Sequence, residues 1–189
     1  MAFFDFLKRN NTSKQPEQRN YVDYRMGLNL DPKQVLVTPD TALTFSAVFA
    51  AVRVIAETIA QLPLNYYIKS SDGRQVNKNS KLQYLIHKEP NPNQTKYVFF
   101  DVMITSLLLY GNCYAFIQRD KLGECEALIF IHPDDVVIKV NNSRVTYVVR
   151  NKEEYDASDI LHIPDMTLDG FIGQSRLSYA RDNIALGIS

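Results

Sequence analysis

Three residues have side chains of the types that hydrolytic enzymes use: Ser175, His132 and His162. Ser175 lies in the segment Gly173-Gln-Ser-Arg-Leu177, where a predicted strand passes into a predicted helix. Hydrolases with a nucleophile elbow carry Gly-x-Ser-x-Gly at such a turn, because the second glycine relieves crowding around the strained serine. Leu177 occupies the place of that glycine. We therefore interpret Ser175 as the N-cap of the helix that follows.

Two short segments combine a histidine with a carboxylate: His132-Pro-Asp134 and His162-Ile-Pro-Asp165. A zinc site needs three or four convergent ligands, and the whole sequence holds 3 histidines. The proline in each segment favours a strand end or a loop. We predict ordinary hydrogen bonds for both histidines, and no catalytic, metal-binding or cofactor-binding residue in the chain. A small serine- or metal-dependent hydrolase built on Ser175, His132 and His162 is the alternative.

Charged residues gather at three places in predicted turns. Asp134-Asp135 and Glu153-Glu154 are neighbouring carboxylates, which in a turn point in different directions into water. Residues 69–81, around a predicted hairpin tip, are the best candidate for a basic patch, but they lack the interleaved aromatic side chains of a nucleic-acid stacking platform. We expect solvated surface at all three places. The basic side chains of the third are Lys69, Arg74, Lys78 and Lys81.

The chain balances 21 basic against 21 acidic residues, which gives a formal net charge of zero. Proteins dedicated to nucleic-acid binding carry a basic excess, because phosphate neutralisation supplies most of their affinity, so this class is excluded for the chain as a whole. Neither Gly-x-x-x-x-Gly-Lys-[Ser/Thr] nor Gly-x-Gly-x-x-Gly occurs. The longest apolar run, residues 98–110, is interrupted by Asp101 and is too short to cross a bilayer, so we expect no membrane partner.

The two cysteines, Cys113 and Cys125, fit a reducing compartment. In a hairpin around residues 120–124, Cys113 faces the region of Ile131 while Cys125 faces Arg119. We therefore expect the thiols to lie too far apart for a disulfide.

A chain of 189 residues with 46% apolar content suits one domain with an arm. Residues 1–37 are polar and aperiodic, and we predict a flexible N-terminal arm there, followed by a folded body at residues 38–189. From Ser175 onward the helical pattern runs through Ile184 and Ile188 to the end of the sequence without a convincing stop signal, so we expect truncation.

Two longer helices are predicted in the folded body. Residues 96–110 are apolar on most sides and hence deeply buried, with Thr95 as N-cap and Gly111 as the left-handed residue at the end. Residues 44–62 carry one apolar face, with Thr41 or Thr44 as N-cap. The residues of that face, which we expect to be buried, are Val48, Val52, Ile55, Ile59 and Leu62.

A capping box at Ser80 predicts a short helix after it. Six segments read as strands, some of them apolar on both faces as in a covered sheet. We therefore predict an α+β fold: a mixed, largely antiparallel sheet with the helices of residues 44–62 and 96–110 packed on it. The predicted strands are residues 64–69, 112–119, 125–131, 136–140, 145–150 and 160–163.

Six segments in this order resemble the portal proteins of tailed double-stranded-DNA phages, in the branch found in siphoviruses. Each segment alone is weak, and the shared order gives the resemblance its strength. It runs from about Thr38 to Ile188. The segments are residues 41–64, Pro90-Asn-Pro-Asn93, Leu109-Tyr-Gly-Asn-Cys-Tyr-Ala115, Ile131-His-Pro133, Ile160-Leu-His-Ile163 and Asp169-Gly-Phe-Ile-Gly-Gln-Ser-Arg-Leu177.

The resemblance implies a structural subunit, not an enzyme, in a dodecameric ring at the capsid vertex of a virion or prophage product. Such a ring is assembled in the host cytoplasm, forms the channel for DNA packaging and ejection, and joins head to tail. Its implied partners are copies of itself, the packaging ATPase (the terminase large subunit), the capsid protein, head–tail connector proteins and double-stranded DNA without sequence preference. The chain corresponds to the wing-like body, truncated before the stem. A phage adaptor that is not the portal itself is a further alternative.

Overall fold

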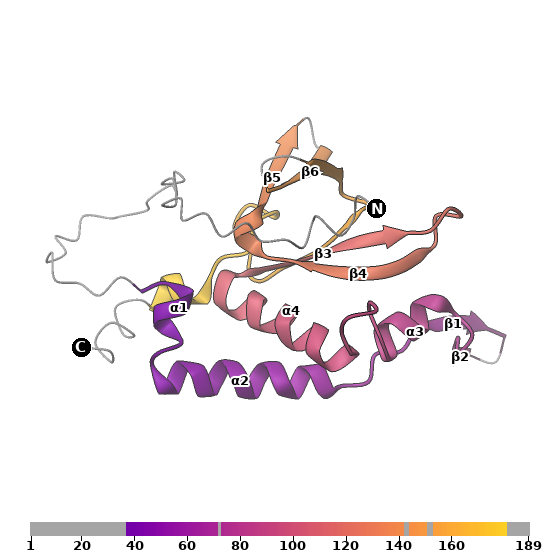
Figure 1. Ribbon diagram of the computed structural model, residues 1–189, viewed down its shortest axis with the longest axis horizontal. Coiled ribbons are helices and arrows are strands. Elements are labelled where there is room, and N and C mark those ends of the chain that lie inside the picture. Colours follow the sequence, from indigo (N-terminus) through magenta and orange to yellow (C-terminus); the bar gives the residue numbers. More distant parts are fainter. Residues whose placement is uncertain (1–36, 72, 142–143, 151–152, 181–189) are drawn as a thin grey trace, which may run out of the picture. The chain divides into compact units, whose positions relative to one another are not determined.

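The structure is a computed structural model that describes residues 37–71, 73–141, 144–150 and 153–180 (Figure 1). The predicted arm, residues 1–37, lies outside the described residues except for Val37, which is buried beside Ala42, Leu109 and Leu177. The elements are, in order, α1 (Pro39–Ala42), α2 (Ser46–Gln61), β1 (Tyr67–Ser70), β2 (Gly73–Val76), α3 (Lys81–His87), α4 (Lys96–Tyr110), β3 (Asn112–Arg119), β4 (Cys125–Ile131), the 3-10 turn η2 (Pro133–Asp135), β5 (Val136–Asn141), β6 (Arg144–Val149), β7 (Glu153–Asp156) and β8 (Ile160–Pro164).

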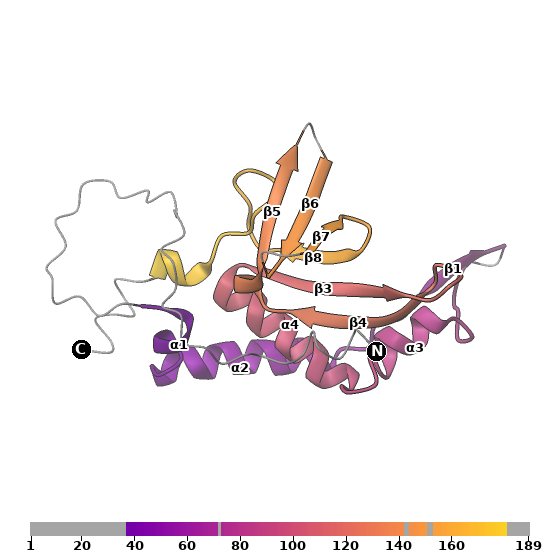
Figure 2. The same cartoon turned by 45° about the horizontal axis from the view of Figure 1, so that its top comes forward.

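The strands pair antiparallel in three sheets, with orders β1-β2, β4-β3-β8 and β5-β6-β7. The α+β class with largely antiparallel pairing is confirmed, whereas the strands do not join into the single sheet we expected. The turn η2 explains the division, because Pro133 cannot donate to a ladder and the turn redirects the chain between β4 and β5. Figure 2 shows β5 and β6 rising away from β3 and β4.

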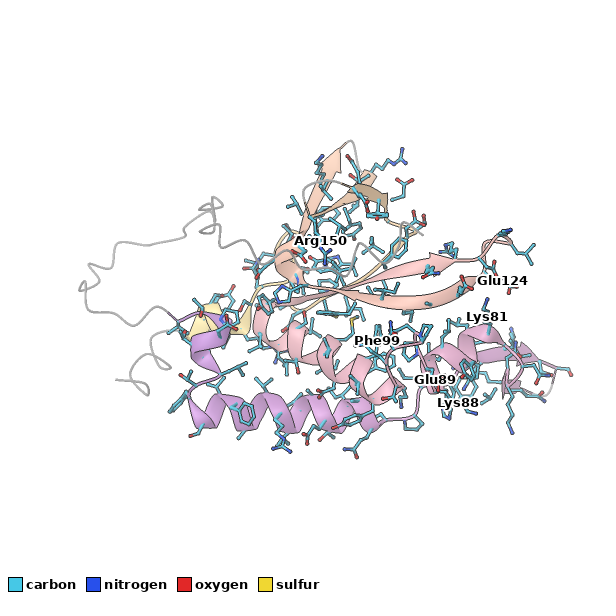
Figure 3. All side chains as sticks on the ribbon, in the orientation of Figure 1. Lys81, Lys88, Glu89, Phe99, Glu124 and Arg150 are labelled. Carbon is cyan, nitrogen blue, oxygen red and sulfur yellow. The ribbon has the colours of Figure 1, made fainter. Side chains whose placement is uncertain are left out.

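Helix α4 has the predicted bounds, Lys96–Tyr110. The Thr95 hydroxyl accepts a hydrogen bond from the Val98 amide at 3.4 Å, and Gly111 ends the helix with φ 75°. One side of α4 packs on β3 and β4, where Phe99 is fully buried (Figure 3). Another side packs on α2 (Figure 1). Helix α4 thus lies between two layers, as its apolar sequence predicted, but Tyr97 and Val98 in its first turn are 40% and 45% exposed. None of the helices within the described residues is both long and apolar enough to cross a membrane.

Helix α2 begins later than predicted and is capped differently. Phe45 holds the N-cap position, and its side chain makes no capping bond. Thr38 and Thr41 instead form a reciprocal capping box that starts α1. The predicted capping box at Ser80 is also wrong: Ser80 precedes α3, but its side chain makes no capping bond. Sequence spacing alone did not show the extra turn of helix before α2.

The predicted buried face of α2 is wrong over its second half. Ile55, Ile59 and Leu62 are 42%, 41% and 54% exposed, whereas Ala56 and Ala60 are buried. Small side chains at these two positions let α2 approach α4 closely, since interaxial distance follows the side chains at the contact. Only the first half keeps the expected orientation: Val48 and Val52 pack against the cluster around Leu109 and Leu177.

Both cysteines are free thiols. In the β3–β4 ladder, Tyr114 pairs with Ile131 and Arg119 with Cys125, as the predicted hairpin required. Cys113 is buried within the cluster of Phe99, Met103, Ala115 and Leu128. Its burial raises the pKa of the thiol to about 12, so Cys113 acts as a small core side chain.

The loop that begins at Pro90 covers the outer edge of β4. The Leu128 amide donates to the Pro90 carbonyl at 2.8 Å, and the Asn91 side-chain amide donates to the Leu128 carbonyl at 2.9 Å. The same Asn91 amide donates to Gln94, and its oxygen accepts from the Asn93 backbone at 3.0 Å. This loop therefore pairs backbone groups that an open sheet edge would leave exposed.

Replacement of Asn91 tests this edge cover. Asn91→Ala leaves the buried Leu128 carbonyl without its donor, and we expect it to lower the free energy of unfolding by about 1–3 kcal/mol. Asn93→Ala is the matched control, because Asn93 contributes its backbone amide and is exposed; a change within about 0.5 kcal/mol is expected. Urea denaturation measures both, and equal effects would contradict this role of Asn91.

Candidate functional site

Ser175 makes a contact that differs from both sequence interpretations. Its hydroxyl donates to the Leu109 carbonyl at 2.7 Å, and the next helix begins at Arg176. The position before the helix is as predicted, but the hydroxyl bonds to the end of α4 instead of capping its own helix. Among described non-glycine residues only Arg150 has positive φ, so Ser175 lacks the strained backbone associated with a nucleophile elbow.

His162 is held from both sides within the molecule. Its Nε2 lies 3.1 Å from the Asn112 side-chain oxygen, and its Nδ1 lies 3.2 Å from the Tyr147 hydroxyl. The ring stacks on Tyr114 with centroids 4.4 Å apart. Burial lowers the pKa of His162 from 6.5 to about 4, so the ring is neutral at pH 7. A neutral ring then donates from Nε2 to Asn112 and accepts at Nδ1 from Tyr147.

His132 has a separate set of neighbours at the end of β4. Its Nδ1 accepts a hydrogen bond from the Asp134 amide at 3.3 Å, and its ring meets Tyr110 edge-on with centroids 4.9 Å apart. No hydrogen bond joins Ser175 to His132 or His162 in the described part of the chain, and no group of three or more metal-ligating side chains converges there. The geometry does not favour the hydrolase alternative.

One carboxylate of each neighbouring pair lies close to a basic side chain. Asp135 lies 3.4 Å from Arg150, and Glu154 lies 3.3 Å from Lys139. These exposed ion pairs contribute little to stability. Two surface hollows contain none of Ser175, His132 and His162. One is lined by Arg144, Thr146, Glu154, Tyr155, Asp156 and Asp159, the other by Tyr67, Ile68, Lys69, Ser70, Ser71, Gly73 and Arg74.

The basic stretch at residues 69–81 lies on β1, β2 and the start of α3. Lys81 points toward the β3–β4 hairpin, where its Nζ lies 3.2 Å from an Asp120 carboxylate oxygen (Figure 3). Tyr66 and Tyr67 at the base of the hairpin are exposed. The stretch is thus solvated, as expected, and these exposed aromatic side chains adjoin it.

The connection from α4 to β3 meets the loop after β8 at a close contact. We name it the Asn112 junction and define it as Gly111, Asn112, His162, Gly173 and Ser175. The Asn112 side chain accepts from the Gly173 amide and donates to the Gly173 carbonyl, each at 2.8 Å. It therefore binds the backbone of Gly173 as a neighbouring strand would. Through His162 and Ser175 the same junction also binds β8 and the last turn of α4.

Two glycines make this approach sterically feasible. A Cβ on Gly173 would lie 1.9 Å from the Gly111 carbonyl oxygen, and one on Gly111 would lie 2.4 Å from the Gln174 carbonyl carbon. The Asp165 amide donates to the Gly111 carbonyl at 2.8 Å. Backbone thus packs directly on backbone at this point, which only glycine permits.

An ion pair fixes the helix that follows. Arg176 donates to both carboxylate oxygens of Asp165, at 2.5 and 2.9 Å, and the pairing lowers the pKa of Asp165. Leu177, one residue on, is buried against Leu109. The junction therefore sets the direction in which the chain leaves the body, and its groups are engaged in structural bonds. We missed it in the sequence, although Gly-Asn and Gly-x-Ser do occur in two of the segments that carried the resemblance.

Comparison with known proteins identifies the relatives of this chain. A model of the family described as phage portal protein matches residues 46–189. The "Probable portal protein" of Streptomyces phage phiC31 is 34% identical over 175 residues, which cover 81% of this chain and 36% of that protein. The portal protein of Enterobacteria phage HK97 is 23% identical and covers 81% of this chain and 37% of that protein. The chain thus spans little more than a third of these relatives.

Solved structures share the fold. An HK97-family phage portal protein from Corynebacterium diphtheriae superimposes with a TM-score of 0.59 at 20% identity, covering 79% of this chain and 46% of that one. The neck of the native gene transfer agent particle, computed with C12 symmetry, gives a TM-score of 0.56 at 21% identity, over 79% of this chain and 42% of that one.

The glycine contact can be tested by a single methyl group. Gly173→Ala places Cβ against the backbone of Gly111 and Asp165, and we expect a loss of at least about 3 kcal/mol in the free energy of unfolding. Gly170→Ala is the control: open space surrounds Gly170, and its φ of 81° accounts for a cost of about 1–2 kcal/mol. Denaturant titration compares the two. A Gly173→Ala effect no larger than that of Gly170→Ala would show that the contact does not constrain the fold.

Acidification tests the neutral state of His162. The unfolded histidine titrates near pH 6.5 and the folded one near 4, so between these values the unfolded state binds more protons. Stability should therefore fall as the pH drops from 6.5 to 4. The slope should stay below about 1.4 kcal/mol per pH unit, the limit for one proton bound by the unfolded state alone, because both states are partly protonated within this range.

His162→Gln should flatten this pH dependence, whereas His132→Gln should preserve it. Thermal melting at several pH values between 4 and 7 measures the three proteins. An unchanged pH profile in His162→Gln would contradict the assignment.

Proposed function

Because this chain belongs to the phage portal protein family, we propose that it serves as a structural subunit of the portal ring at one vertex of a virion capsid. The proposal rests on the family match, which spans residues 46–189 and so takes in α2, the Asn112 junction and the helix that begins at Arg176. A subunit of this kind works by packing beside copies of itself. The Asn112 junction is consistent with that role, because its polar side chains are engaged in hydrogen bonds within the subunit.

The ring we propose has twelve subunits. A closed ring is built from heterologous contacts, in which each subunit offers two different surfaces to its two neighbours. A chain in the neck of the gene transfer agent particle has this fold, and that neck was computed with C12 symmetry for the native particle and C6 symmetry for the empty one. Both symmetries are compatible with a ring of twelve.

Within that ring, residues 38–189 would form the wing-like body, and the helix that begins at Arg176 would lead toward the stem. The contacts at the start of this helix support the division into a body and a segment that leads away from it. Arg176 is tied to Asp165, and Ser175 to the end of α4, so the helix starts in a fixed direction. A body joined rigidly to the next segment can transmit the position of the outer ring to the channel.

The proposed partners follow from the position in the ring. They are the terminase large subunit, which would supply ATP hydrolysis, the capsid protein, the head–tail connector proteins, and double-stranded DNA passing through the channel during packaging and ejection. The subunit would assemble in the host cytoplasm and remain in the virion.

Imaging of the assembled protein tests this function. The complete product of the gene that encodes this sequence, purified and imaged by electron microscopy, should form rings with twelve-fold symmetry. The 189-residue chain expressed alone should stay monomeric or aggregate, since contacts made by a stem would be missing. A gene product that remains a monomer at every concentration in sedimentation would contradict the proposal, as would hydrolase activity that depends on Ser175.

A further inference from the structure

The outer face of α2 is apolar and has no partner within the described residues. We name as the α2 face the six residues Ala51, Val54, Ile55, Thr58, Ile59 and Leu62, which span one continuous arc of the helix and its C-cap. All are exposed, and Val54 is 63% exposed. The opposite side of the helix already packs on α4 through Ala56 and Ala60. The α2 face is therefore not part of the core of the described body.

The polar groups on and beside this face are already satisfied. The Thr58 hydroxyl donates to the Val54 carbonyl at 2.6 Å, which leaves its methyl group outward. Arg53 and Glu57, which lie beyond one edge of the face, pair with each other at 2.7 Å. If a partner covered the α2 face, no charged group would be buried without an opposite charge. Burial of its apolar side chains is favourable. Monomers seldom expose apolar patches larger than roughly 300–600 Å², and larger ones mark interaction sites.

A second apolar surface lies on the loop between β8 and the helix at Arg176. We name as the loop patch Met166, Leu168, Phe171 and Ile172, which are 59%, 73%, 39% and 44% exposed. One Asp169 oxygen accepts from the backbone amides of Phe171 and Ile172, each at 2.8 Å. The Asn112 junction holds the end of the loop at Gly173. This patch is thus apolar and ordered before any partner arrives, which lowers the entropic cost of binding.

The two surfaces face different ways. In both views the loop that follows β8 lies beyond the sheet β4-β3-β8, on the side of α4 away from α2 (Figures 1 and 2). Two distinct apolar surfaces on opposite sides of one subunit are what a heterologous contact requires. A contact of α2 with the α2 of another copy would instead be isologous, and it would close as a dimer.

We propose that the α2 face of one copy binds the loop patch of the next copy around the ring. This inference rests on the proposed portal function and identifies the surfaces that join its subunits. The occupant of the α2 face is therefore a second copy of this chain. The Asn112 junction acts as a positioning element for the contact, because it fixes the loop that carries the patch.

Crosslinking within assembled rings tests this contact. The background is the complete gene product with Cys125→Ser, in which the buried Cys113 is retained. Thr58→Cys and Leu168→Cys are combined in this background, and the assembled protein is treated with a short bismaleimide. Denaturing electrophoresis should show a ladder of covalent multimers. At each contact in the ring, the cysteine introduced by Thr58→Cys on the α2 face of one subunit would lie near the cysteine introduced by Leu168→Cys on the loop patch of the next, so that the two substitutions together link neighbouring subunits. The variants with Thr58→Cys alone or Leu168→Cys alone should remain monomers. The matched control combines Leu168→Cys with Leu122→Cys, a residue of the β3–β4 turn that is 87% exposed, and should also remain monomeric.

The outcomes separate this inference from the proposed function. Twelve-fold rings without a ladder would overturn the contact and leave the portal function standing, whereas absence of rings in the unsubstituted gene product would remove the function first. Multimers from Thr58→Cys alone would show an α2–α2 contact and also overturn the proposal.

Introduction of a charge on the α2 face gives an independent readout. Ile55→Glu should abolish ring formation while the monomer stays folded, because Ile55 is 42% exposed there. Leu122→Glu should form normal rings. Normal rings from Ile55→Glu would contradict the contact.

Discussion

The contact between the backbones of Gly111 and Gly173 is the constraint on which the rest of the structure depends. The Asn112 side chain holds these segments together with two hydrogen bonds of 2.8 Å, and neither glycine leaves room for a Cβ. Because Gly111 ends α4 and Gly173 precedes the last described helix, one contact determines the angle between them. Backbone packed on backbone cannot adjust as two flexible side chains could, so the direction of this helix is set by the body.

The neighbouring groups reinforce this constraint instead of performing chemistry. His162 is neutral and links Asn112 to Tyr147 on β6, so the two three-stranded sheets meet at the same polar cluster. Such a network specifies one arrangement when all its members are bonded. The apolar surfaces on α2 and on the loop after β8 then face outward in fixed positions. A protein that is rigid inside and apolar at two separate surfaces is suited to repeat around an axis.

Much of the fold could be predicted from local sequence signals, but contacts over long distances could not. Thr95 and Gly111 gave the bounds of α4, and turn residues gave the β3–β4 hairpin. Periodicity found the apolar stripe of α2 but could not say what covers it, so Ile55 and Ile59 were wrongly placed in the core. The junction joins residues separated by 61 positions, and no local pattern encodes that approach.

A reconstruction of the assembled ring at side-chain resolution tests the central claim most directly, because it shows what touches α2 and the loop after β8. The account predicts that Ile55 and Ile59 of each subunit lie buried against Leu168 and Phe171 of its neighbour, with the Asn112 junction unchanged. A ring in which α2 faces solvent, or in which Ser175, His132 and His162 converge on one pocket, would contradict it.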